Sequence, residues 1–229
     1  MLKAILFDLD HTLFDRHATL TALVPEFRRA FRVNPALSDA EVARIWCTAD
    51  DHWVYDGWKY IFSYLCENGV FTAPPDYADY RSFVFRAFAG TAVPFDFVLP
   101  MLEDFKKQGY MVGLITNGRH ELQYAKLKLT GLLYVFDEIL VSGDYPAEKP
   151  EKELFLIACE KLGITPDEAV YVGDNRRNDV DGAKGAGMRA VWLCGTNDTQ
   201  TGRYEPDATI DDLRKLPEAI AALRQQGGR

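Results

Sequence analysis

The sequence predicts an α/β protein, with a Rossmann-like, mostly parallel sheet, helices on both faces and a small all-helical domain inserted into it. Two observations predict this class. Short apolar runs alternate with helical patterns over the second half of the chain, which is typical of parallel βαβ units. A first apolar run at the N-terminus is separated from the others by a long stretch whose apolar residues recur only at helical spacing.

The expected strands are short apolar runs, each long enough for one buried strand. They cover residues 2–7, 111–115, 138–141, 169–172, 189–193 and 208–210. The expected helices between and after them cover residues 119–129, 151–162, 179–186 and 211–226. Pro150 is expected in the first turn of the second of these helices, and Gly187 is placed to end the third.

The stretch between the first strand and the rest contains no run that resembles a buried parallel strand. Its apolar residues fall on helical faces in three groups: Leu20, Leu23, Val24, Phe27 and Phe31; Trp58, Ile61, Phe62 and Leu65; Tyr80, Phe83, Val84 and Phe88. Proline-containing breaks separate the groups. We therefore expect a core domain of residues 1–14 and 94–229 and a helical domain of residues 15–93.

Composition excludes several classes of protein. The net charge of −8 argues against binding of a nucleic-acid polymer, which needs a basic face. No apolar stretch reaches the length of a membrane span, and the N-terminal run is too short for a secretory signal. The four cysteines have no paired spacing, so we expect reduced thiols and a cytoplasmic protein.

Two carboxylates follow the first strand, and they carry the strongest chemical signal. Asp8 and Asp10 are two residues apart, so they project to the same side if the extended backbone continues. Open α/β sheets bind ligands at this carboxyl edge. Close carboxylates repel each other unless a cation or a shared proton intervenes. The pair therefore predicts a metal site, a proton-transfer site or both.

Three further loops add the remaining polar groups. Thr116, Asn117 and Gly118 follow a strand and can offer a hydroxyl and backbone amides to a phosphate. Lys149 comes just before a helix, and the loop after the strand at 169–172 holds two further acids, Asp174 and Asp179. Carboxylates, a hydroxyl and a cation are what phosphoryl transfer with a hard divalent metal requires.

Four features of the sequence resemble the four motifs of the haloacid dehalogenase-like (HAD) superfamily. They are Asp-x-Asp-x-Thr at 8–12, a threonine after the second core strand, Lys149 before a helix and Gly-Asp-x(4)-Asp at 173–179. The resemblance covers residues 1–14 and about 94–229. It implies a phosphatase in which Asp8 is the nucleophile and Asp10 the general acid and base. It further implies that Thr116, Asn117, Gly118 and Lys149 hold the phosphoryl group.

The resemblance also implies a Mg²⁺ site made by Asp8, the Asp10 backbone carbonyl and Asp174, supported by Asp179. A helical insertion after the first motif is similar to the cap of the subclass that acts on small soluble metabolites, so the expected partner is a small phosphorylated metabolite such as a nucleoside monophosphate or a sugar phosphate. Three alternatives remain: phosphonate cleavage, phosphomutase activity and a non-catalytic binding module. Phosphonate cleavage would need a lysine in the cap, and Lys59 is the only lysine of the insertion.

Several residues have two interpretations at this stage. Arg176 and Arg177 are either solvated loop charges or groups that recruit an anion. An aromatic cluster in the insertion is either helical core, which we favour, or a surface that stacks on a substrate. Its members are Trp46, Trp53, Tyr55, Trp58, Tyr60, Phe62 and Tyr64.

Overall fold

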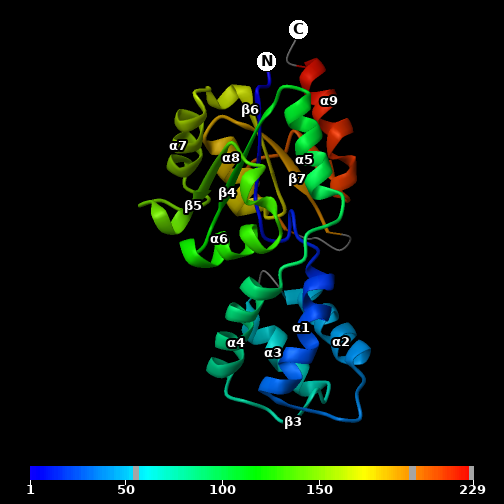
Figure 1. The fold of residues 1–229 in the computed structure, drawn as a ribbon. Helices are drawn as coiled ribbons and strands as arrows, with labels where there is room; N and C mark the ends of the chain where they lie inside the picture. The colour runs from blue at the N-terminus through cyan, green and yellow to red at the C-terminus, as the bar shows by residue number, and fades with distance from the viewer. Residues whose placement is uncertain (54–56, 196–199, 227–229) are drawn as a thin grey trace. The chain divides into compact units, whose positions relative to one another are not determined.

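The computed structural model describes residues 1–53, 57–195 and 200–226, which divide into two compact units. Unit 1 comprises Met1–Phe14 and Pro94–Arg229, and unit 2 comprises Asp15–Val93. The first strand of unit 1 precedes unit 2 in the chain and its other elements follow it, so unit 2 is an insertion into unit 1 (Figure 1).

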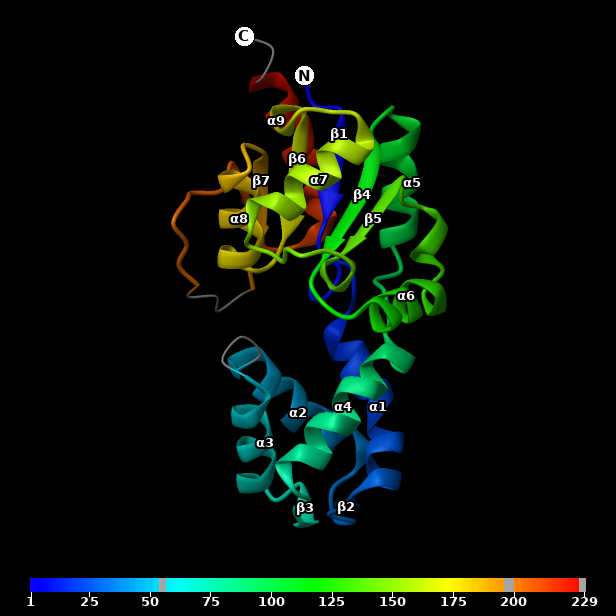
Figure 2. The same ribbon diagram turned by 90° about the vertical axis from the view of Figure 1, so that its left-hand side faces the viewer.

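Unit 1 is built on a six-stranded sheet in the order β5-β4-β1-β6-β7-β8, with every pair of neighbours parallel. Its strands are β1 (Ala4–Phe7), β4 (Met111–Thr116), β5 (Glu138–Val141), β6 (Ala169–Gly173), β7 (Arg189–Leu193) and β8 (Ala208–Ile210). The strand order changes direction at β1, which lies between β4 and β6 (Figure 2). Ligands of open parallel sheets bind at such a switch point. The predicted α/β class is confirmed.

Helices cover both faces of this sheet (Figures 1 and 2). They are α5 (Val98–Lys107), α6 (His120–Leu129), α7 (Lys152–Leu162), α8 (Gly182–Gly185) and α9 (Leu216–Gln226). Short 3₁₀ turns join them at Leu132–Tyr134, Ser142–Asp144, Pro166–Glu168 and Leu213–Lys215, and a π-helical turn, η4, covers Arg176–Asp181.

The strand β1 shows why these residues form a central strand. All of its residues are buried, as expected for a parallel strand covered on both faces. Ala4 and Leu6 belong to a core cluster that also contains Phe155 of α7 and Ala183 of α8. Since side chains alternate along a strand, Ile5 and Phe7 point to the opposite face.

The helices differ from the sequence-based expectation in three places. The helix expected over 179–186 is the π-helical turn η4 followed by the short α8. Pro150 lies before α7, whose first residue is Lys152, and does not belong to its first turn. Helix α5 was not predicted, although its Leu102 and Phe105 are buried.

Unit 2 contains four helices and a short antiparallel ribbon. The helices are α1 (Arg16–Ala30), α2 (Asp39–Trp53), α3 (Trp58–Glu67) and α4 (Tyr77–Thr91), and the ribbon strands are β2 (Arg32–Val33) and β3 (Phe71–Ala73). The expectation of an all-helical insertion missed this ribbon because its strands have only two and three residues. The Asp15 side chain caps α1 by accepting a hydrogen bond from Ala18 N at 2.8 Å.

The aromatic cluster of unit 2 lies mostly in its core. Trp46 is buried against Phe27, with ring centroids 4.6 Å apart, and Phe62 packs on Tyr80 at 4.9 Å. Tyr60 is exposed, and Tyr55 lies outside the described residues. Among the helices that the structure describes, none is both long and apolar enough to cross a membrane.

Candidate active site

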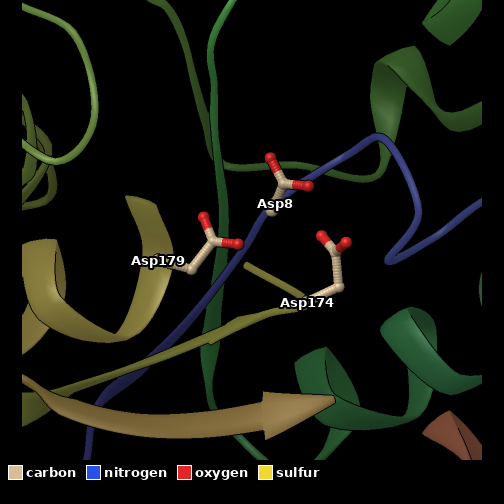
Figure 3. Close-up of side chains that lie close together, drawn as sticks. All are labelled: Asp8, Asp174 and Asp179. Carbon is tan, nitrogen blue, oxygen red and sulfur yellow. The ribbon is translucent and has the colours of Figure 1, made fainter. Parts of the chain in front are cut away.

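Three aspartates meet beyond the carboxyl ends of β1 and β6. The register pairs Phe7 with Val172, so Asp8 and Asp174 follow neighbouring strands at nearly the same level. Asp8 N also donates to Val172 O at 2.9 Å, which extends the strand pairing. Carboxylate oxygens of Asp8, Asp174 and Asp179 lie within 4.8 Å of one another, and all three residues are buried (Figure 3).

The turn η4 brings Asp179 back over the end of β6. The Asn175 side chain accepts from Asn178 N at 2.8 Å and so caps this turn, while Asn175 N donates to Asp179 Oδ2 at 2.9 Å. Gly173 makes this return possible, because a Cβ added to it would collide with the Asp179 carboxyl group. The sequence Gly-Asp-x(4)-Asp therefore has a steric reason for its glycine as well as a chemical reason for its acids.

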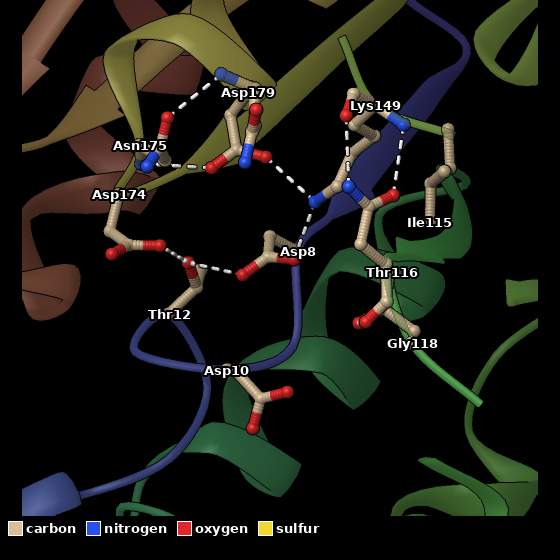
Figure 4. Close-up of polar contacts among 12 residues, drawn as sticks. Asp8, Asp10, Thr12, Ile115, Thr116, Gly118, Lys149, Asp174, Asn175 and Asp179 are labelled. Carbon is tan, nitrogen blue, oxygen red and sulfur yellow. Dashed lines mark hydrogen bonds and ion pairs between the residues drawn. The ribbon is translucent and has the colours of Figure 1, made fainter. Parts of the chain in front are cut away.

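Lys149 joins two of the carboxylates through one ammonium group (Figure 4). Its Nζ donates to Asp8 Oδ1 at 2.5 Å, to Asp179 Oδ1 at 2.7 Å and to the Tyr171 hydroxyl at 2.9 Å. An ammonium group has three N–H donors, so these contacts use all of them. The Tyr171 hydroxyl in turn donates to Ile115 O at 2.7 Å.

The loop after β4 holds the backbone of Lys149. Asn117 Oδ1 accepts from Lys149 N at 2.8 Å, and Asn117 Nδ2 donates to Lys149 O at 2.9 Å. The Asn117 side chain therefore positions the lysine and is not turned toward a ligand. Gly118 N donates to Ser142 Oγ at 3.1 Å, so the amide that the sequence analysis offered to a phosphate has a protein acceptor in this structure.

Burial and ion pairing shift the pKa values of this group. Burial raises the pKa of Asp8 to about 7, although Lys149 opposes part of the shift. Burial alone would lower the pKa of Lys149, but the Asp179 and Asp8 carboxylates outweigh it and hold that pKa well above its ordinary value. Among Asp8, Asp174, Asp179 and Lys149, negative charges outnumber positive charges by two when all are ionised.

This donor set fits a divalent cation. Hard cations such as Mg²⁺ prefer carboxylate oxygens, and a cation would offset the excess negative charge. Thr12 is fully buried, and its hydroxyl lies 3.4 Å from Asp8 Oδ2 and 3.3 Å from Asp174 Oδ1, so its single O–H can donate to either acid. Both oxygens of Asp179 accept hydrogen bonds, from Lys149 and from Asn175 N.

Asp10 lies apart from the three clustered acids (Figure 4), and two side chains of helix α6 donate to it. Lys126 Nζ donates to Asp10 Oδ1 at 2.6 Å and to Oδ2 at 2.8 Å, and Gln123 Nε2 donates to Oδ2 at 2.9 Å. Burial alone would raise the pKa of Asp10, but Lys126 and Gln123 lower it to about 2. The loop turns at His11, whose φ of 66° is in the left-handed region.

Other charged residues have different surroundings. Arg176 is buried and lies over the Trp192 ring at 4.9 Å, so the interpretation of a solvated charge is wrong for it, whereas Arg177 is exposed. Arg16 forms a two-contact ion pair with the buried Asp50 inside unit 2. Lys59 is exposed on α3.

Comparison with known proteins decides the family. The haloacid dehalogenase-like hydrolase family matches residues 5–193, which is most of the chain. The chain is a haloacid dehalogenase-like hydrolase. The resemblance drawn from the four motifs is thereby confirmed.

Named relatives of this hydrolase include several phosphatases. It is 39% identical to phosphoserine phosphatase of Thermus thermophilus over 121 residues, which are 52% of this chain and 49% of the relative. It thus spans about half the length of that protein. It is 29% identical to pyrophosphatase PpaX of Bacillus velezensis over 224 residues, covering 93% of this chain and 94% of the relative.

Solved structures share its fold. A HAD phosphatase from Thermococcus onnurineus is similar with a TM-score of 0.62 and 29% identity, covering 96% of this chain and 98% of the other. YfnB of Bacillus subtilis has a TM-score of 0.71 at 22% identity, covering 96% of this chain and 98% of the other, and shows the common fold.

Sequence reasoning missed three residues that touch this site: Tyr171, Gln123 and Lys126. Tyr171 stands in a fully buried strand, where a hydroxyl needs a partner. Gln123 and Lys126 occupy the buried face of α6 together with Leu127, at positions where a helix normally carries apolar residues. Polar residues at core-facing positions were the available signal.

Proposed function

We propose that this hydrolase is a Mg²⁺-dependent phosphatase that acts on a small phosphomonoester through an aspartyl-phosphate. The observation that carries the proposal is the buried cluster of Asp8, Asp174 and Asp179, in which Lys149 forms ion pairs with Asp8 and Asp179. The similarity to phosphoserine phosphatase and to pyrophosphatase PpaX supports it. Residues 15–93 would act as the cap that selects the substrate.

Asp8 would attack the phosphorus atom, forming an Asp8 O–P bond while the P–O bond to the leaving group breaks. Asp10, whose pKa is low in this structure, would take up a proton from solvent as the anionic substrate binds beside it and would then give that proton to the leaving oxygen. Water would then attack phosphorus, its proton would pass to Asp10, and the Asp8 O–P bond would break. Asp8 and Asp174 would hold Mg²⁺ with the Asp10 carbonyl, and the ion would neutralise charge on the phosphoryl oxygens.

The other residues of the site prepare this reaction. Lys149 would reduce the repulsion between the Asp8 carboxylate and an anionic substrate by neutralising Asp8 and Asp179. The buried Thr116 hydroxyl is the side-chain donor that we assign to the transferring phosphoryl group, with the Asn117 backbone beside it. We leave the Gly118 amide out of this assignment because it donates to Ser142.

The test is phosphate release from a panel of nucleotide, sugar, amino-acid and organic-acid monophosphates, with Mg²⁺ and with excess EDTA. We expect Mg²⁺-dependent release from one substrate class and loss of at least 1000-fold of the turnover in Asp8→Asn, since the nucleophile is removed. The exposed Asp104 provides the control Asp104→Asn, which should behave as wild type. Undiminished release by Asp8→Asn would refute the proposed function.

A further inference from the structure

Helix α6 turns two polar side chains toward the site instead of apolar ones. Gln123 is 2% exposed and Lys126 is 9% exposed, and the two lie three residues apart on the same helical face. Burying a lysine costs free energy unless its charge is paired. Its partner is the Asp10 carboxylate, which belongs to the loop after β1 and not to the helix.

The contacts of these two residues hold Asp10 at both oxygens and connect it with the loop after β4. Lys126 reaches Oδ1 and Oδ2 of Asp10, and Gln123 reaches Oδ2. The same Gln123 Nε2 lies 2.6 Å from Thr116 Oγ1 and 3.1 Å from Asn117 O. One amide nitrogen therefore lies between Asp10 and the hydroxyl assigned to the phosphoryl group.

We propose that Gln123 and Lys126 are positioning residues for Asp10, holding its carboxyl group where it exchanges a proton with the leaving oxygen and then with water. The inference rests on the proposed phosphatase function. The bond changes are those given above, and neither residue takes part in them. The Asp10 side chain is 35% exposed. Lys126 keeps this side chain from turning further toward solvent, and Gln123 fixes the position of Asp10 relative to Thr116.

The leaving group distinguishes this role from a purely structural one. Phenyl phosphate and 4-nitrophenyl phosphate have similar shapes, but nitrophenol is far more acidic and leaves with little help from a general acid. A misplaced Asp10 should therefore slow the release of phenol much more than the release of nitrophenol. A general loss of folding or of substrate binding should slow both equally.

The experiment measures single-turnover release of phenol and nitrophenol, with Mg²⁺, by wild type, Lys126→Met, Lys126→Arg and Gln123→Leu. For Lys126→Met we expect phenol release to fall by about 10- to 100-fold, within the usual contribution of a general acid, and nitrophenol release by less than about threefold. Lys126→Arg should restore most of the phenol rate. Lys128→Met, an exposed position on the same helix, should match wild type for both esters.

Three results would overturn the inference: equal losses on both esters, wild-type rates in Lys126→Met and Gln123→Leu, or faster phenol release. Urea unfolding of each variant identifies one that fails to fold, and Gln123→Leu and Lys126→Arg then decide the question by the same ratio of rates. If wild type hydrolyses neither ester nor any member of the substrate panel, the proposed function fails and this inference falls with it. Turnover by wild type with unchanged ratios in the variants overturns the positioning role alone.

Discussion

At the scale of single residues, the site depends on the ammonium group of Lys149. Its three donors are used by Asp8, Asp179 and Tyr171, and its backbone is held on both sides by the Asn117 amide. A lysine side chain has many rotatable bonds, so such complete engagement fixes a group that would otherwise be mobile. A partner that orients Lys149 should therefore matter even without touching the substrate.

Tyr171→Phe tests this orientation. The change removes the acceptor for one Lys149 donor and the donor to Ile115 O, leaving both buried, so we expect a loss of about 1–3 kcal/mol in the free energy of unfolding. Turnover should fall by roughly 10-fold, as for other partners that orient site residues. Urea unfolding and steady-state kinetics measure the two effects.

The control for Tyr171→Phe is Tyr134→Phe, since Tyr134 is 88% exposed. It should leave stability and turnover unchanged. Wild-type turnover in Tyr171→Phe would show that the tyrosine does not help to place Lys149.

At the scale of elements, the connection from β6 to η4 is closely packed at Gly173. Gly173 leaves room for the Asp179 carboxyl group, and the Asn175 side chain caps the turn that returns Asp179 to it. The backbone path of this connection therefore also determines where Asp174 and Asp179 lie.

Gly173→Ala should force the Asp179 side chain away and destabilise the protein by about 1–3 kcal/mol, the usual cost of overpacking. It should also weaken Mg²⁺ binding, which isothermal titration calorimetry measures. Gly185→Ala is the matched control, because a Cβ at Gly185 meets nothing within 4 Å. Equal stability and Mg²⁺ affinity in the two variants would contradict the steric account.

Elements with a strong local pattern could be predicted from the sequence, and contacts between elements could not. The apolar run that ends in Gly173 and Asp174 predicts the strand β6, whereas the sequence predicts an ordinary helix over 179–186 because the π-helical turn η4 has no distinct local pattern. Asp8 and Asp174 were assigned from their places at strand ends. The two hydrogen bonds between the Asn117 side chain and the Lys149 backbone depend on how two loops meet in space. A local sequence pattern carries no information about such a contact.

At the scale of the whole molecule, the chain has separate cores in its two units. Phe27, Trp46 and Tyr80 belong to the cluster of unit 2, whereas Phe155 and Tyr171 belong to a cluster of unit 1. Each unit thus has apolar interior of its own, as expected for a unit with its own folding stability.

Phe27→Ala should destabilise unit 2 by about 3–5 kcal/mol, the usual cost of removing a buried phenylalanine, because Phe27 is fully buried among aromatic rings. Hydrogen exchange should then become faster in α1, α2 and α4, while β1 and β6 stay protected. Equal acceleration in both units would show that they unfold as one.

The central claim is that Asp8 carries the phosphoryl group between substrate and water. The most direct test is to quench the Mg²⁺-loaded enzyme in acid during turnover of its best substrate, digest it and locate the added phosphoryl group by mass spectrometry. The account predicts a phosphoryl group on the peptide that contains Asp8, and its absence in Asp8→Asn. Turnover with the phosphoryl group on another residue, or with no phosphorylated enzyme under any quench time, would contradict it.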